Sequence, residues 1–157
     1  MAAHVVAVDT SCLVALVCGW HEHHGQTIAA LDERLDAGAV LSVAAPALVE
    51  AYAVLTRLPA PQRLAPQDAL ALLRGNFHGH MRSVALAATD YWSVLEHAPA
   101  SGVHGGRTYD AIIAACARKA GARELLTLNP RHFESFADAA LTITSPIAPS
   151  IPGRHRQ

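Results

Sequence analysis

Three acidic residues stand where a carboxylate is costly unless something compensates its charge. Asp9 directly follows the apolar residues 5–8, which predict a short strand buried on both faces. Glu50 lies in a rather apolar segment that predicts a helix, and Asp110 lies in the first turn of another predicted helix. Burying a carboxylate is unfavourable unless the group is paired or binds a cation. These three side chains are therefore the first candidates for a chemical site.

Carboxylates that converge on one point repel each other, and a divalent cation relieves that repulsion. Hard cations such as Mg²⁺ prefer oxygen ligands, at about 2.0–2.1 Å, and usually keep several waters. A bound ion of this kind lowers the pKa of a coordinated water and neutralises charge that builds up on a phosphate. Clustered acids in a chain of net charge −1 thus suit phosphodiester hydrolysis, with the metal supplying the positive charge.

Each acid also has a purely structural interpretation. Asp9 can serve only as a helix cap or turn residue, and Asp110 can simply favour the helix dipole. Glu50 can be a solvated residue with good helix propensity. Thr10 and Ser11, the two hydroxyl residues after Asp9, are predicted to cap the helix that follows. The catalytic interpretation depends on whether the fold brings the three acids together.

The hydrophobic pattern predicts strands that alternate with helices. Strands are expected at residues 5–8, 40–43, 84–87, 124–128 and 141–143. Helices are expected at residues 12–17, 26–36, 46–58, 67–75, 91–98, 108–120 and 132–136, with Thr89 and Asp90 capping the fifth. Such alternation predicts an α/β fold with a mainly parallel sheet of four to five strands covered by helices. In open sheets of this kind chemistry gathers outside the carboxyl ends of the strands, where Asp9 is expected.

Composition limits the alternatives. At 157 residues, 52% apolar and 16% charged, the chain is expected to form one domain at residues 1–145, with a loosely ordered tail at 146–157. No apolar run approaches the ~20 residues of a membrane helix, and the start lacks a basic signal-peptide region. Cys12, Cys18 and Cys116 are expected to be buried thiols of a cytoplasmic protein. A net charge of −1 argues against holding nucleic acid by bulk electrostatics.

Four segments, in this order and spacing, make the chain resemble the PIN-domain family, and within it the VapC-type toxins of bacterial toxin–antitoxin pairs. The likeness extends to about Ile143. The segments are Val8-Asp9-Thr10-Ser11, Leu48-Val49-Glu50-Ala51-Tyr52, Arg107-Thr108-Tyr109-Asp110-Ala111-Ile112-Ile113-Ala114-Ala115-Cys116-Ala117 and Leu125-Leu126-Thr127-Leu128-Asn129-Pro130-Arg131-His132-Phe133.

The resemblance implies a three-layer α/β/α sandwich and an endoribonuclease that depends on Mg²⁺ or Mn²⁺. It makes Asp9, Glu50 and Asp110 the acids around the metal, and Thr10 or Ser11 the group that orients Asp9 or a water. Asn129 falls where the family often has a fourth acid, which favours one ion over two. The resemblance also implies an RNA substrate, a homodimer and a cognate antitoxin that blocks the cleft.

Several polar and aromatic residues have open roles. Arg107 is a candidate contact for a substrate phosphate or an antitoxin carboxylate, ahead of Arg131 and His132. His21, His23 and His24 suggest either a transition-metal site or a solvated helix start, and the second is favoured because no cysteine or acid is clearly placed to complete a site. The aromatic residues expected to pack rather than to stack on bases are Trp20, Tyr91 and Trp92.

Two functions compete with the nuclease. A PIN-like domain can be a catalytically weak or inactive binding module, and Asn129 in place of an acid favours that possibility. A phosphatase that uses Asp9 as its nucleophile is the third hypothesis. The haloacid dehalogenase pattern, however, has a second acid two residues later, where this chain has Ser11.

Overall fold

The computed structural model describes residues 3–147, and they form a five-stranded sheet flanked by helices. The strand order is β3-β2-β1-β4-β5, and every neighbouring pair is parallel. The strands are β1 (Val5–Val8), β2 (Val40–Ala44), β3 (Arg82–Val84), β4 (Glu124–Leu126) and β5 (Thr142–Thr144). The α/β prediction is confirmed, with the larger of the two expected strand numbers.

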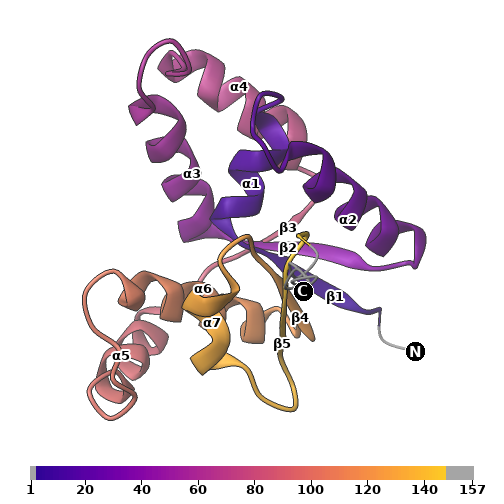
Figure 1. The fold of residues 1–157 in the computed structure, drawn as a ribbon. Coiled ribbons are helices and arrows are strands. Elements are labelled where there is room, and N and C mark those ends of the chain that lie inside the picture. Colours follow the sequence, from indigo (N-terminus) through magenta and orange to yellow (C-terminus); the bar gives the residue numbers. More distant parts are fainter. Residues whose placement is uncertain (1–2, 148–157) are drawn as a thin grey trace, which may run out of the picture.

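The helices lie on the two faces of this sheet (Figure 1). The group on one face consists of α1 (Thr10–Val17), α2 (His24–Asp36), α3 (Ala45–Arg57) and α4 (Pro66–Phe77). The group on the other face consists of α5 (Ala88–His97), α6 (Arg107–Lys119) and α7 (Pro130–Phe133), which the 3₁₀ turn Glu134–Phe136 extends. The result is the three-layer sandwich that the sequence resemblance implies.

The central strand is β1, and its four residues are all buried. Its last residue, Val8, lies beside Val43 of β2 on one side and Leu126 of β4 on the other. The strands that follow β1 first in the chain, β2 and β3, lie on one side of it, and the later strands β4 and β5 lie on the other. In parallel sheets a crevice forms where the strand order reverses in this way. Asp9 is the first residue beyond that point.

Helix ends follow local chemistry, with two corrections. Asp9, rather than Thr10 or Ser11, is the N-cap of α1, since its carboxylate accepts a hydrogen bond from the Ser11 backbone N–H. The N-cap of α5 is Ala87, so the predicted cap at Thr89 and Asp90 is wrong, although Asp90 accepts a hydrogen bond from the Ala87 N–H at 2.9 Å. Strand β3 spans Arg82–Val84, so the strand predicted at residues 84–87 is displaced toward the N-terminus and shares only Val84 with it.

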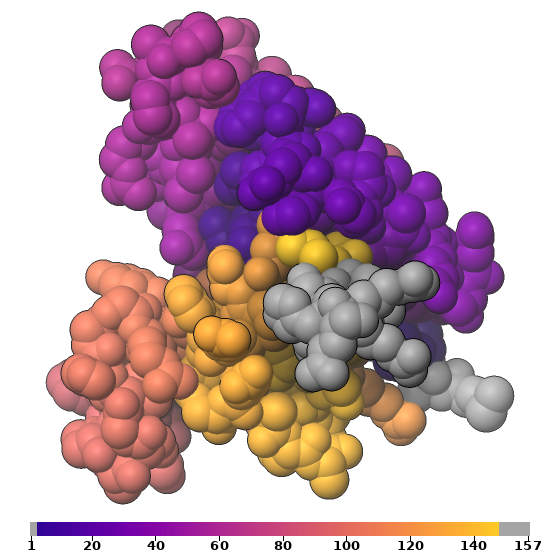
Figure 2. Space-filling model, in the orientation of Figure 1, coloured from indigo at the N-terminus to yellow at the C-terminus, as the bar shows by residue number. Residues whose placement is uncertain are grey.

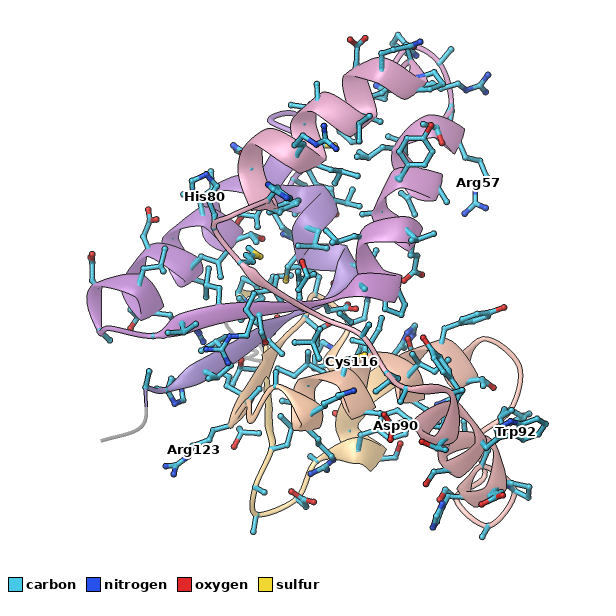
Figure 3. The ribbon with its side chains drawn as sticks, turned by 180° about the vertical axis from the view of Figure 1, so that it is seen from behind. Arg57, His80, Asp90, Trp92, Cys116 and Arg123 are labelled. Atoms are coloured by element: carbon cyan, nitrogen blue, oxygen red, sulfur yellow. The ribbon has the colours of Figure 1, made fainter. Side chains whose placement is uncertain are left out.

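The core fills the space between the layers. Its largest fully buried side chains come from both helix groups and from the sheet, and they include Leu13, Leu55, Leu125, Phe133 and Leu141. The three cysteines are buried and unpaired, as predicted; Cys116 faces the interior from α6 in the view from behind (Figure 3). Within residues 3–147 no helix is long and apolar enough to cross a membrane. The tail predicted from residue 146 lies outside the described residues from 148 onward.

Candidate active site

The strand ends place Asp9 and Thr127 side by side. Both residues follow neighbouring parallel strands, β1 and β4, and the Asp9 backbone N–H donates to the carbonyl oxygen of Leu126 at 3.0 Å. Asp9 is 5% exposed and Thr127 is fully buried. The apolar strand therefore carries a carboxylate to the edge of the core, where it must find donors or a cation.

Hydroxyl groups hold the Asp9 carboxylate from one side. Ser11 Oγ and Thr127 Oγ1 each donate a hydrogen bond of 2.8 Å to Asp9 Oδ2. Ser11 Oγ in turn accepts from the Leu128 backbone N–H at 2.9 Å, and Thr127 Oγ1 accepts from the Asn129 N–H at 3.0 Å. Among the described residues every donor to this carboxylate goes to Oδ2. Oδ1 is thereby left with its lone pairs for a ligand.

Glu50 reaches the same place from α3. It is an exposed residue, and its Oε2 accepts a hydrogen bond of 2.7 Å from the hydroxyl of Thr10, the first residue of α1. Helix α3 packs against α1, so the bond joins two elements that are forty residues apart in the chain. The Thr10 hydroxyl thus orients the Glu50 carboxylate, just as the hydroxyls of Ser11 and Thr127 orient the Asp9 carboxylate.

Asp110 comes from the first turn of α6, on the opposite face of the sheet. Burial raises the pKa of its carboxyl above the usual range, and the negative charges of Asp9 and Glu50 raise it further. His132 and Arg107 act in the other direction, and His132 Nδ1 lies 3.7 Å from Asp110 Oδ2. The contributions of Asp9 and Glu50 indicate that the three acids lie close enough to influence one another.

All three acids line one open cleft of about 490 Å³. In Figure 2 the surface is indented between the α3 side of the molecule above and the α6 side below, with early residues of the chain between them. The cleft is lined by Asp9, Thr10, Ser11, Val14, His21, Glu22, His23, Glu50, Val54, Asp110, Leu128, Asn129, His132 and Phe133. Of the residues predicted for the site, only Arg107 is not in this set.

The donor set suits a hard divalent cation. It offers three carboxylates, the amide oxygen of Asn129 and two hydroxyls, and oxygen ligands are those that Mg²⁺ and Mn²⁺ prefer. Burial is the main cause of the raised pKa of Asp110, and a cation between the acids would remove the repulsion that adds to it. Within residues 3–147, however, no three acidic, histidine or cysteine side chains already converge at ligand distance.

Arg107 is directed away from the cleft. Its Nη2 donates a hydrogen bond of 2.6 Å to Ser135 Oγ, and its guanidinium carbon lies 5.9 Å from the centre of the Phe136 ring. Its Nε is buried without a hydrogen-bond partner in the described part of the chain. A contact between Arg107 and a phosphate would require the side chain to leave Ser135, and it stays a prediction.

Sequence reasoning missed Thr127, which hydrogen-bonds Asp9 but does not itself line the cleft. Thr127 was quoted only as part of a motif, although its place directly after a buried strand is the signal that singled out Asp9. His21 and His23 are half-buried in the wall of the open cleft, and His23 is the N-cap of α2, so the favoured interpretation of the cluster as a helix start is confirmed. His24 turns away and hydrogen-bonds the carbonyl oxygen of Ala15 at 2.8 Å. His132, ranked below Arg107, is the group that lies against Asp110.

Comparison with known proteins identifies the family. The PIN domain family model matches residues 6–139, and the chain therefore belongs to the PIN-domain family. It is 39% identical to Ribonuclease VapC40 of Mycobacterium tuberculosis over 132 residues, which cover 84% of this chain and 92% of the relative.

Two solved structures share the fold at low sequence identity. The toxin VapC20 of M. tuberculosis, described as cleaving the sarcin-ricin loop, is 22% identical with a TM-score of 0.58, covering 76% of this chain and 86% of its own. VapBC-1 from nontypeable Haemophilus influenzae is 14% identical with a TM-score of 0.62, covering 90% of this chain and 98% of its own.

Proposed function

We propose that the protein is an endoribonuclease that uses Mg²⁺ or Mn²⁺ to hydrolyse RNA phosphodiester bonds. The observation that carries the proposal is the meeting of Asp9, Glu50 and Asp110, from three separate elements, on one cleft. The name of the relative VapC40, a ribonuclease, supports the choice of RNA as substrate. The family to which the chain belongs supports the choice of metal.

When bound, the cation would supply the positive charge that lowers the pKa of a water and neutralises charge on the phosphate. Asp9, Glu50 and Asp110 would hold it, with Asn129 as an uncharged oxygen donor that favours a single ion. Ser11 and Thr127 fix one oxygen of Asp9 and leave the other toward the ligand. Positioned donors of this kind remove the need to reorganise the site during the reaction.

Asp110 must be ionised in order to bind a cation, although its raised pKa opposes ionisation. His132, 3.7 Å away, favours the ionised form and is placed to orient the carboxylate. Thr10 holds Glu50 at the start of α1 until a ligand competes for the same oxygen. The chain's own residues thus position the acids and set their charge.

The same proposal makes the protein the toxin of a type II toxin–antitoxin pair in the cytoplasm. The VapC name of its relative and the resemblance to VapC-type toxins support a cognate antitoxin that covers the cleft, and a homodimer as the working form. Both partners are proposals that size-exclusion chromatography of the protein, alone and co-expressed with the product of a neighbouring reading frame, would test.

A non-catalytic binding module is the second candidate, and two observations favour it. Asn129 stands where the family often has an acid, and within the described chain no three ligands already converge. A calorimetric titration with Mn²⁺ separates the two functions, because a scaffold has no need to bind metal at these acids. One binding event that is lost in the Asp9→Asn variant supports the nuclease.

The direct test is cleavage of single-stranded RNA by purified protein with Mg²⁺ or Mn²⁺, with a chelator as control. Wild-type protein is expected to cleave RNA only when metal is present. The Asp9→Asn variant is expected to show no cleavage, although circular dichroism should show that it is folded. Cleavage that persists in the chelator, or in Asp9→Asn at the wild-type rate, would contradict the proposal.

A further inference from the structure

The cleft has an unusual charge for a site that takes RNA. Four acidic residues line it (Asp9, Glu22, Glu50 and Asp110), and no lysine or arginine does so among residues 3–147. Phosphate contacts from Arg and Lys normally supply most of the affinity for nucleic acid. One bound divalent cation offsets only part of this negative charge. The substrate must therefore gain affinity from contacts that do not depend on charge.

A row of three aromatic rings offers such a contact. It occupies the turn between α1 and α2 and consists of Trp20, His21 and His23. The ring centres of Trp20 and His21 are 6.1 Å apart, and those of His21 and His23 are 5.8 Å apart. His21 and His23 line the cleft, whereas Trp20 extends the row outward and is 55% exposed. At 55% and 66% exposure, Trp20 and Trp92 do not fit the prediction that their side chains pack.

Backbone contacts hold this turn in place before any ligand arrives. The His21 N–H donates to the carbonyl oxygen of Cys18 at 2.9 Å, and the His23 N–H donates to His21 Nδ1 at 3.1 Å. The next residue is tied down as well, since His24 Nδ1 lies 2.8 Å from the Ala15 carbonyl oxygen. A platform fixed in this way loses little conformational entropy when it binds a ligand.

The environment of His21 also favours the neutral form of its ring. Burial lowers the pKa of His21, and the neighbouring His23 and His24 lower it further, against the opposing effect of Glu22. An imidazole ring presents a flat face on which a base can stack. The same three histidines do not form a metal site in the described chain, since His24 points toward Ala15.

We propose that Trp20, His21 and His23 form a nucleobase subsite that stacks an unpaired base of the RNA next to the phosphate held at the acids. The inference rests on the proposed nuclease function and adds the form of its substrate. Proteins recognise single-stranded RNA and RNA loops by stacking splayed bases on aromatic side chains, including histidine. Such stacking tolerates different bases because every base has a π-face. The substrate class is therefore single-stranded or loop RNA rather than a continuous duplex.

The test compares Trp20→Ala with Trp92→Ala. The two tryptophans are the only ones in the chain and are similarly exposed, at 55% and 66%. Trp92 points outward from α5, away from the rest of the molecule (Figure 3), so it is a matched control for losing an exposed indole. Steady-state cleavage of a single-stranded RNA oligonucleotide gives KM and kcat for each variant, with Trp20→Phe as the conservative replacement.

We expect Trp20→Ala to raise KM about five- to tenfold, at the lower end of what a stacked base contributes, with kcat nearly unchanged. Trp20→Phe should recover most of the affinity, and Trp92→Ala should match wild type. In a series of oligonucleotides with one abasic nucleotide at each position in turn, one position should abolish the difference between wild type and Trp20→Ala.

Unchanged KM in Trp20→Ala, or an equal rise in Trp92→Ala, would overturn the subsite. So would a Trp20 effect that no abasic position removes, because it would indicate contact with the backbone or a general loss of structure. The failure of the nuclease proposal is distinguishable, since the wild-type protein itself would then cut no RNA in the presence of metal.

Discussion

The first prediction concerns the buried hydroxyl of Thr127, because its hydrogen bond to Asp9 connects the protein core to the candidate active site. Thr127→Val replaces the hydroxyl with a methyl group of similar size, so no cavity is expected at this fully buried position. The substitution removes the 2.8 Å hydrogen bond to Asp9 Oδ2. A hydrogen bond to a charged group is worth about 1.5–3 kcal/mol. The Asn129 N–H also loses its acceptor, but Asn129 is exposed and water can replace it.

We therefore expect the free energy of unfolding to fall by about 2 kcal/mol in a urea titration. The rate of RNA cleavage should fall by roughly 10- to 100-fold, the usual effect of removing a group that orients a metal ligand. The concentration of Mg²⁺ needed for half-maximal rate should rise. Thr127→Ser restores the hydroxyl and is expected to recover most of the activity.

Thr144→Val is the matched control. Thr144 also donates to a carboxylate, Glu124 Oε1 at 2.6 Å, but it does so on the edge strand β5 and away from the cleft. It should lose stability without losing cleavage rate or changing the Mg²⁺ requirement. If Thr127→Val cleaves RNA as Thr144→Val does, with the same dependence on Mg²⁺, then the hydroxyl does not position Asp9 for metal and the reasoning is wrong.

Three further predictions follow from charge and burial. Burial acts to raise the pKa of Glu124, but hydrogen bonds from Arg34 and other groups outweigh it and lower the pKa below 4.5. The Arg34–Glu124 ion pair therefore stabilises the fold fully above pH 4.5, and this contribution is lost as the pH falls through the lowered pKa of Glu124. In Glu124→Gln, the free energy of unfolding measured in urea should fall less steeply with decreasing pH in the acid range. Burial and then the Asp9 charge raise the pKa of Cys12 to about 12, so iodoacetamide at pH 8 should leave Cys12 unlabelled in native protein; labelling at the rate of a free thiol would contradict its burial. In metal-free protein, Asp9→Asn should lower the pKa of Asp110, measured by carboxyl NMR, because one of the charges that raise it is removed; an unchanged value would show that the two acids do not interact.

Residues that follow strands were predictable because their pattern is local. The buried run before Asp9 identifies the strand, and parallel order then puts its carboxyl end at the crevice. The alternation of strands and helices likewise predicted the layers. Thr127 obeys the same rule, yet a buried threonine is common in strands, and only its bond to Asp9 distinguishes it. Pattern alone could not show that bond, because it joins residues 118 positions apart.

Side-chain direction was the part that sequence could not supply. Arg107 was favoured over His132 for its charge and its place before α6, but its guanidinium packs on Phe136 while His132 lies against Asp110. Trp20 was expected to pack because its neighbours are apolar, and the tight turn after α1 instead leaves its ring half-exposed. The direction of Arg107 is set by contacts with Ser135 and Phe136, which are distant in the chain and cannot be inferred from a single sequence.

The most direct test of the central claim is the rate at which the Asp110→Asn variant cleaves single-stranded RNA in Mg²⁺, measured beside wild type at equal folded concentration. Asparagine keeps the shape of the side chain and removes the charge that the cation requires. The account predicts metal-dependent cleavage by wild type and none by the variant. Cleavage by Asp110→Asn at the wild-type rate would contradict it, because the three acids would then not act together on one ion.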